Sequence, residues 1–424
     1  MPVLPRALMR LTVRPGKSPG HTAALLGAFC LFLSTLEYLV PKPIPFIRIG
    51  LANVPLMIAL DLFPWRAFAF LVLLKVLGQA LITGVLFSYV FLLSLAGTCA
   101  SAAVMYLLAR CLDRNRLGFT GIGVIGALVS NLSQLFLARF FILGAGVKFL
   151  LPPFLISGMV TGTALGLFCE TFTARSAWYR RARGLAGRLP ALPEGIPPGE
   201  IPPGEPPRQS IPRRAAEGQR RFRELFSSRD LCFAGLIMAG LFLFNPSTPL
   251  RCLQFLFFWL LLLLGGKKNN TPMTLAVILG IVFFNVLIPY GKVLAEIGPF
   301  RLTQGSLLSG LRKAVTLEGL IMLSRVSIRP DLRLPGRFGA LMGESFRILE
   351  EILRRKGVVT RKKFVEGLDR LLTELSAEAG AYGENQAAAP SPEPKRKLPG
   401  LVFLTAAVLL TAGFTAAGFI RSGL

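Results

Sequence analysis

Apolar segments of bilayer length recur along most of this chain. A helix needs about 20 apolar residues to cross a membrane, and its backbone polar groups must pair internally because lipid offers them no partners. We expect six such helices in the first part of the chain, at 22–40, 49–63, 66–83, 86–110, 118–143 and 150–173. Further helices are expected at 231–244, 251–266, 272–290, 303–324 and 398–420. The pattern predicts an all-α polytopic membrane protein with a six-helix bundle and a second helical membrane domain.

The charge distribution also fits a membrane protein. Hydrophobic residues make up 53% of the chain and charged residues 17%, and the mean hydropathy is +0.58. The net charge of +26 would suit a nucleic-acid partner, but 27 of the 48 basic residues are concentrated in 174–230, 325–370 and 395–397. Such clusters are typical of cytoplasmic loops that face lipid headgroups. We expect contacts with membrane lipids, no nucleic-acid partner, and a multi-pass chain with a cytoplasmic N-terminus.

A proline-rich stretch divides the chain into domains. The sequence PEGIPPGEIPPGEPP repeats the unit I-P-P-G-E, and proline fixes φ and removes hydrogen-bond donors, so this stretch is expected to be an extended spacer. The expected organisation is a membrane domain, a Pro/Gly/Arg-rich cytoplasmic linker, a second membrane domain, a polar linker and a last transmembrane helix. Their boundaries are 1–180, 181–225, 226–380, 381–397 and 398–424.

Two amphipathic stretches precede the last apolar segment. Residues 337–357 place apolar side chains at helical spacing with Arg and Glu on the opposite face, and residues 362–375 do the same. Both are too charged to cross a bilayer. The pattern alone does not separate docking of a partner from packing against the chain's own membrane domain.

Motifs for several chemistries are missing from the sequence. No G-x-x-x-x-G-K-[ST] motif occurs, so the chain is not expected to hydrolyse ATP by a P-loop of its own. Aspartates do not cluster as in a magnesium-diphosphate site. With a single histidine, His21, and scattered cysteines, no metal site is indicated either. We therefore predict no catalytic residues and no cofactor bound by this chain.

Polar side chains inside the apolar segments form the candidate binding site. A charge at such depth costs several kcal/mol, so it usually has a use. Lys75 and Gln79 lie one helical turn apart on the third segment, and the spacing on the fifth is interpreted as a shared face for Asn131, Gln134 and Arg139. Cations with amide neighbours suit a small anionic solute. The candidate residues are Arg48, Asn53, Lys75, Gln79, Asn131, Gln134 and Arg139.

A structural role remains an alternative for the same residues. In that case Arg48 and Arg139 would reach the headgroups, and Lys75 would pair with Glu37 at the end of the first segment. A second signal comes from the first segment itself. Its small residues, Ala24 and Ala28 among them, form a stripe that permits close approach of another helix.

The first part of the chain resembles a known transporter family. The stretch TAALLGAFCLFLSTLEYLVPKPIPFIRIGLAN, with SLAGT at 94–98 and SNLSQ at 130–134, is similar to the Gx transporter family over residues 20–173. Members of that family carry the name heptaprenyl diphosphate synthase component I and resemble substrate-binding S-components of energy-coupling factor (ECF) importers. The resemblance implies six helices that capture a vitamin or precursor from outside. It also implies an interface with the T-component through Ala24 and Ala28. At its third helix the family has a basic residue and two glycines, where this chain has Lys75, Gly78 and Gln79.

The second part resembles an ECF T-component. LTQGSLLSGLRKAVTLEGLIMLSRVSI is similar to a T-component segment, and amphipathic helices follow it as coupling helices would. The family's coupling helices carry short Ala-Arg-Gly or Ala-Arg-Ser motifs that insert into ATPase subunits. The positions that approximate such a motif are Arg354, Arg355 and Gly357, with a second basic turn at 325–329.

These resemblances imply a fused S- and T-component in the bacterial cytoplasmic membrane. The expected partners are ECF-type ATPase subunits, which would use ATP, and a small anionic vitamin or isoprenoid or quinone precursor. Two alternatives stay open: a membrane-associated subunit of heptaprenyl or polyprenyl diphosphate synthesis, and a membrane scaffold without a solute.

Overall fold

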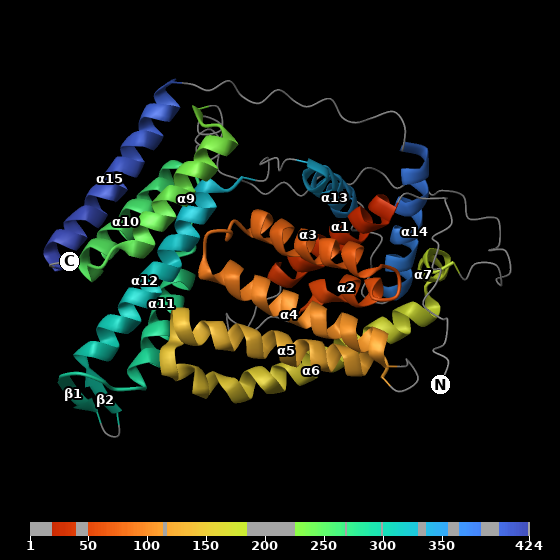
Figure 1. The fold of residues 1–424 in the computed structure, drawn as a ribbon, viewed down its shortest axis with the longest axis horizontal. Coiled ribbons are helices and arrows are strands. Elements are labelled where there is room, and N and C mark those ends of the chain that lie inside the picture. The colour runs from red at the N-terminus through yellow and green to blue at the C-terminus, as the bar shows by residue number, and fades with distance from the viewer. Residues whose placement is uncertain are drawn as a thin grey trace, which may run out of the picture.

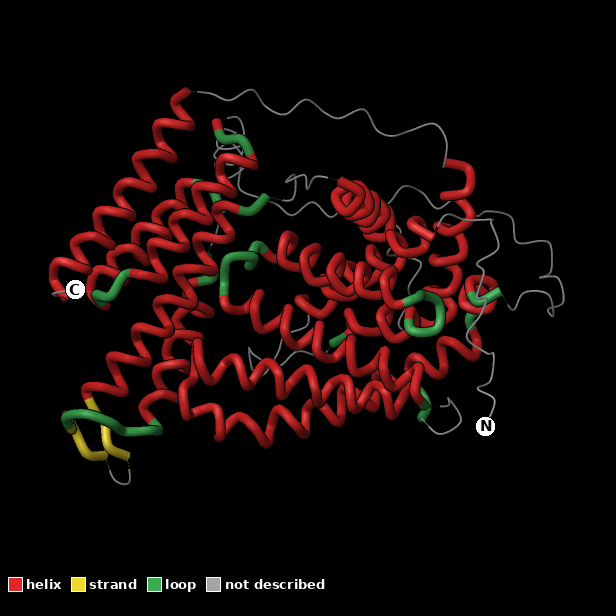
Figure 2. The backbone as a smooth tube through the Cα atoms, viewed as in Figure 1, coloured by secondary structure: helices red, strands yellow, loops and turns green. Residues whose placement is uncertain are grey.

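The residues that the structure describes fold almost entirely into helices, with one small hairpin among them (Figures 1 and 2). The computed structural model describes residues 19–39, 50–112, 117–184, 225–267, 269–297, 300–329, 336–354, 364–382 and 398–422. Four of its helical stretches are long and apolar enough to cross a membrane, at Trp65–Thr83, Tyr89–Cys111, Phe119–Arg175 and Leu398–Ser422. The expected fold class, an all-α polytopic membrane protein, is confirmed.

The first block comprises α1 to α7. Its helices are α1 Pro19–Leu39, α2 Val54–Ala59, α3 Trp65–Thr83, α4 Tyr89–Cys111, α5 Phe119–Ala138, α6 Val147–Arg175 and α7 Ala177–Ala182. Short turns join them: the 3₁₀ turns η1 Leu51–Asn53 and η3 Gly144–Gly146, and the π-helical turn η2 Arg139–Leu143. The second expected segment is therefore only a short helix, and α7 was not expected.

Glycines bring α5 and α6 into direct backbone contact. A Cβ atom on Gly162 would lie 2.7 Å from the carbonyl oxygen of Gly123, and one on Gly166 would lie 2.3 Å from the Cα atom of Thr120. Larger side chains would push the two helices apart. The small residues therefore set the close spacing of this pair, as is usual for helices within membranes.

The second block comprises α9 to α12 and α15. Its elements are α9 Ser228–Phe244, α10 Thr248–Leu264, α11 Thr271–Val286, β1 Val293–Ile297, β2 Phe300–Thr303, α12 Gln304–Ser327 and α15 Leu398–Ser422. The two strands form an antiparallel hairpin that places Glu296 opposite Arg301.

The last helix, α15, is part of the second block. Gln254 of α10 is fully buried and donates hydrogen bonds to the carbonyl oxygen of Thr411 and the hydroxyl of Thr415. Its own amide oxygen accepts a 2.8 Å bond from Asn245 at the end of α9. These buried polar contacts fix α15 against α9 and α10, because breaking them would leave unpaired polar groups in an apolar core.

The amphipathic helices pack mainly against the first block. They are α13 Gly336–Arg354 and α14 Phe364–Tyr382. Apolar side chains of α13 and α14, such as Ile352 and Leu372, share one hydrophobic core with α1 to α7, although Met342 of α13 also shares a small apolar cluster with Ile328 at the end of α12. In space the pair therefore groups with the first block, although the chain reaches it from α12. This packing also buries Ala23 to Ser34 of α1, so that stretch has no surface left to face lipid.

One end of the first block lies along the side of α12. At this end Gly144 lies against Lys313, where a Cβ would come 2.9 Å from Nζ, and the backbone N–H of Phe87 donates a 3.2 Å hydrogen bond to Ser324. Lys313 and Ser324 are eleven residues apart on α12, which corresponds to about 16 Å of helix. Two turns from the same end of the first block thus contact widely separated points of α12. In Figure 1, α5 and α6 end beside α12, and their axes are inclined to those of α12 and α15.

Candidate functional site

A buried cation lies in the middle of the first block. Lys75 of α3 is 4% exposed, and its Nζ donates a hydrogen bond to the side-chain oxygen of Asn53, at the end of η1. Glu37, in the last turn of α1, is also buried and accepts a 3.1 Å hydrogen bond from the backbone N–H of Gly50. The chain can turn here because Gly50 adopts a φ of 83°, which favours glycine. Lys75 and Asn53, both predicted site residues, are brought together.

The other predicted site residues do not join them in one cavity. Gln79 is partly buried one turn further along α3. Asn131 donates a 2.7 Å hydrogen bond to the backbone carbonyl of Phe154 in α6, and Gln134 donates one of 2.9 Å to Ser130. Arg139 is exposed. Arg48 lies outside the described residues.

The expectation of a shared face on α5 is wrong for Arg139. Five residues separate Gln134 from Arg139, so at 3.6 residues per turn the two lie about 140° apart around the axis. A π-helical turn also begins at Arg139 and changes the winding beyond it. Gln134 lines a cavity between the two blocks, whereas Arg139 is not among the residues that line it.

That cavity was not anticipated from the sequence. It has a volume of about 190 Å³ and lies between α4 to α6 of the first block and α11 and α12 of the second. The residues that line it are Val90, Leu93, Gln134, Leu135, Ala138, Ile142, Leu143, Leu150, Phe154, Met273, Val277, Leu317, Glu318 and Ile321. The only hint in the sequence was Glu318, the single acidic residue of α12.

The small-residue stripe of α1 faces α13. Ala24 and Ala28 are fully buried, and the carbonyl oxygen of Ala24 accepts a 3.0 Å hydrogen bond from the hydroxyl of Ser345 in α13. Between them, Gly27 leaves no room for a side chain, since a Cβ there would lie 3.0 Å from the Ser345 oxygen and closer still to Leu74. At the start of α1, Nδ1 of His21 lies 2.7 Å from the carboxylate of Glu344.

A second contact fixes α14 to the first block. Asp369 of α14 accepts hydrogen bonds from the backbone N–H groups of Ala177 and Trp178, at 3.1 and 3.0 Å, and from the hydroxyl of Ser176. The next residue in α7, Tyr179, donates a 2.6 Å hydrogen bond to Asp61 in the turn after α2. A partly buried chain of polar contacts therefore links α14, α7 and the α2–α3 turn.

The candidate coupling residues lie at the end of α13. Arg354 is the last residue of that helix and is exposed. Arg355 and Gly357 lie outside the described residues. Among the residues that the structure describes, no three His, Cys, Asp or Glu side chains group in a way that could hold a metal ion.

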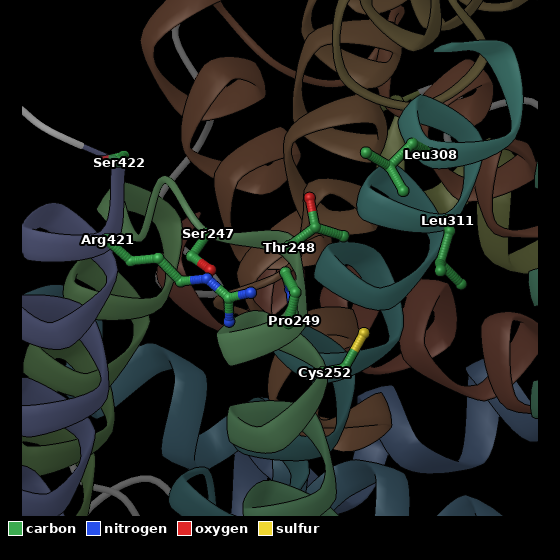
Figure 3. A pocket seen from close by; sticks show the side chains of 8 residues that line it. All are labelled: Ser247, Thr248, Pro249, Cys252, Leu308, Leu311, Arg421 and Ser422. Carbon is green, nitrogen blue, oxygen red and sulfur yellow. The ribbon is translucent and has the colours of Figure 1, made fainter. Parts of the chain in front are cut away.

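A wider hollow lies at one end of the second block (Figure 3). It has a volume of about 410 Å³, and Ser247, Thr248, Pro249 and Cys252 of the α10 region line it together with Leu308, Leu311, Arg421 and Ser422. The exposed side chain of Arg421 extends from α15 toward the first residues of α10. No buried polar group of this hollow is left for a ligand to pair with in the part of the chain described.

Comparisons with known proteins match two parts of the chain. Residues 26–172 match the family model of heptaprenyl diphosphate synthase component I. Residues 229–330 match a domain of unknown function (DUF8519). No curated protein and no solved structure matches the chain. The first block, which contains Lys75 and Asn53, is thus similar to heptaprenyl diphosphate synthase component I proteins.

Proposed function

We propose that the chain is the membrane component of an ECF-type importer that binds a small anionic solute and works with separate ATPase subunits. The observation that carries this proposal is the inclination of the helices of the two blocks, which meet at α12. Membrane helices tilt by about 20° on average and by at most about 40°. Because the helices of the two blocks are inclined to each other, the two blocks cannot both align with the bilayer normal. The arrangement therefore suits a protein in which one block rotates against the other.

The contacts of α13 support the same proposal. An S-component must bind the coupling helices of its T-component, and here the small-residue stripe around Ala24 packs on an amphipathic helix that follows the second block. Because the two blocks belong to one chain, their encounter is intramolecular, at an effective concentration of roughly millimolar for a flexible tether.

The buried cation provides the solute chemistry. Lys75 and Asn53 offer an ammonium group and a side-chain amide at one place in the first block. A carboxylate or phosphate on a vitamin-sized solute would bind them by charge-assisted hydrogen bonds. The solute would replace Asn53 as the hydrogen-bond acceptor of Lys75, so that the ammonium group already in place would bind it.

A reversible cross-link tests whether the blocks move. A Cβ on Gly84 would lie 3.8 Å from the Cβ of Arg325, which is the usual separation in a disulfide. Gly84 has a φ of 66°, so cysteine there costs about 1–2 kcal/mol, less than a typical disulfide contributes. We expect Gly84→Cys with Arg325→Cys, in a background without the native cysteines, to lock the blocks.

The measurement is ATP hydrolysis by the complex that co-purifies with the chain, in lipid nanodiscs. The oxidised double variant should lose ATP turnover and regain it on reduction, whereas each single variant should be insensitive to reductant. Full turnover in the cross-linked state would show that the blocks need not move. Absence of any P-loop ATPase from the purified complex would remove the importer proposal altogether.

A second candidate function is a membrane subunit of heptaprenyl or polyprenyl diphosphate synthesis. The observation that favours it is the match of residues 26–172 to the family of that name, since Lys75 is also suited to hold a diphosphate. This role predicts co-purification of a soluble prenyltransferase instead of ATPases. It also predicts that prenyl transfer continues unchanged in the cross-linked protein.

A further inference from the structure

The cavity between the blocks contains a carboxylate in apolar surroundings. Its lining comes from both blocks and is apolar except for Gln134 and Glu318. Glu318 of α12 is only 5% exposed. A single water needs about 10–15 Å³ of such space, so a volume of about 190 Å³ accommodates a small organic molecule.

No described basic group neutralises Glu318 by an ion pair. In the part of the chain that the structure describes, its carboxylate interacts with the hydroxyl of Thr274, and Arg325 acts on it only as a charge nearby. Two other basic residues of this region are engaged elsewhere: Arg251 with Thr316 at 2.8 Å, and Lys313 with Asn285 at 3.0 Å. An ionised carboxylate that is buried without a partner costs several kcal/mol.

The chemistry of the lining selects the ligand. Gln134 donates one of its two amide N–H groups to Ser130, so it can offer a ligand its acceptor oxygen as well as the second N–H. Glu318 is an acceptor as well when ionised. A carboxylate in an apolar cavity, with an amide oxygen beside it in the lining, favours a ligand that brings N–H donors and a positive charge on an apolar body.

We propose that this cavity binds a small organic cation, with its ammonium head against Glu318 and its apolar body among Leu135, Ile142 and Phe154. The site is separate from Lys75 and takes the opposite charge. Because both blocks form its walls, the ligand binds only while they stand in the arrangement described here. Binding must therefore stabilise this arrangement over any other.

Phenethylamine is a suitable probe, with phenethyl alcohol as its uncharged counterpart. Binding of each to the purified full-length protein is measured by equilibrium dialysis at neutral pH, against detergent micelles alone. The wild-type protein should bind the amine saturably and the alcohol much more weakly. Glu318→Gln should weaken amine binding by about 10- to 100-fold, the range for a hydrogen bond to a charged group. The matched control Glu296→Gln, in the exposed hairpin, should bind like wild type.

A second variant keeps the test decisive if Glu318→Gln does not fold. Val277→Phe fills part of the cavity and retains the carboxylate, so it should abolish amine binding by exclusion. Equal binding of the amine by Glu318→Gln and wild type would overturn the proposal. So would equal affinity for the amine and the alcohol, or no saturable binding by the wild-type protein.

Discussion

The carboxylate of Asp369 in α14 accepts a 3.0 Å hydrogen bond from the backbone N–H of Trp178 in α7, a residue 191 positions away in the sequence. Together with the bonds from Ala177 and Ser176, this contact ties an amphipathic helix that follows the second block to the last helix of the first. The two halves of the chain are thus joined at a point far from α12.

Asp369→Ala should weaken the docking of α14. The variant leaves two backbone N–H groups and the buried hydroxyl of Ser176 without their acceptor, at a cost of about 1–3 kcal/mol. Hydrogen exchange should become faster in α7 and α14, and Asp369→Asn should show a smaller effect because it keeps one acceptor oxygen. Glu366→Ala, on an exposed face of the same helix, is the control. Unchanged exchange in α7 would mean that the contact does not hold the helix.

Gly27→Leu should disturb the packing of α1 on α3 and α13. The space around Gly27 is already filled by Leu74 and Ser345, and overpacking of this kind costs about 1–3 kcal/mol. Gly343→Leu is the matched control, because nothing lies within 4 Å of a Cβ at that position of α13. Thermal unfolding of the purified protein should show a lower midpoint for the first variant only. Equal midpoints would contradict the close packing of α1 on α13.

Lys75→Met should abolish retention of an anionic solute by the purified protein. The methionine keeps the length and apolar stem of the side chain but removes the only part that binds an anion. Native mass spectrometry of the detergent-purified protein measures the retained small molecules. Lys148→Met removes an exposed lysine of the same block and should retain the solute. Retention by Lys75→Met would assign Lys75 a structural role with Asn53.

Arg251→Met should destabilise the second block. The guanidinium group donates to the carbonyl oxygens of Asn245 and Leu243 and to Thr316, at 2.6 to 2.8 Å. Loss of these bonds leaves buried acceptors unpaired, at about 1–3 kcal/mol for each acceptor that water cannot reach. Arg421→Met, at the exposed end of α15, should unfold like wild type. The midpoint of denaturation in a mild detergent provides the measurement, and similar midpoints for both variants would argue against this network.

Local patterns were sufficient to predict most of the long helices, but not the short α7 or the packing partners of any helix. The run of apolar residues around Lys75 predicted a membrane helix. The residue that accepts a hydrogen bond from Lys75, Asn53, lies 22 residues away on a separate turn. The amphipathic pattern of 337–357 predicted α13, and left open whether it packs on the chain or on a partner. Its packing on α1 depends on the close contact of Ser345 with Gly27, two residues that are more than 300 positions apart in the sequence. Such contacts depend on how distant helices pack against one another. Helical periodicity describes each helix separately and does not predict that packing.

The sequence by itself determined that this chain is helical, belongs in a membrane and has buried polar side chains, because hydropathy and helical spacing act over a few turns. The tertiary structure alone decided that the helices of the two blocks are inclined to each other, that α13 and α14 cover α1, and that Glu318 faces a cavity with Gln134. The physical reason is that these outcomes depend on small residues and buried polar groups matching between distant segments, and such matching is settled only when the helices pack.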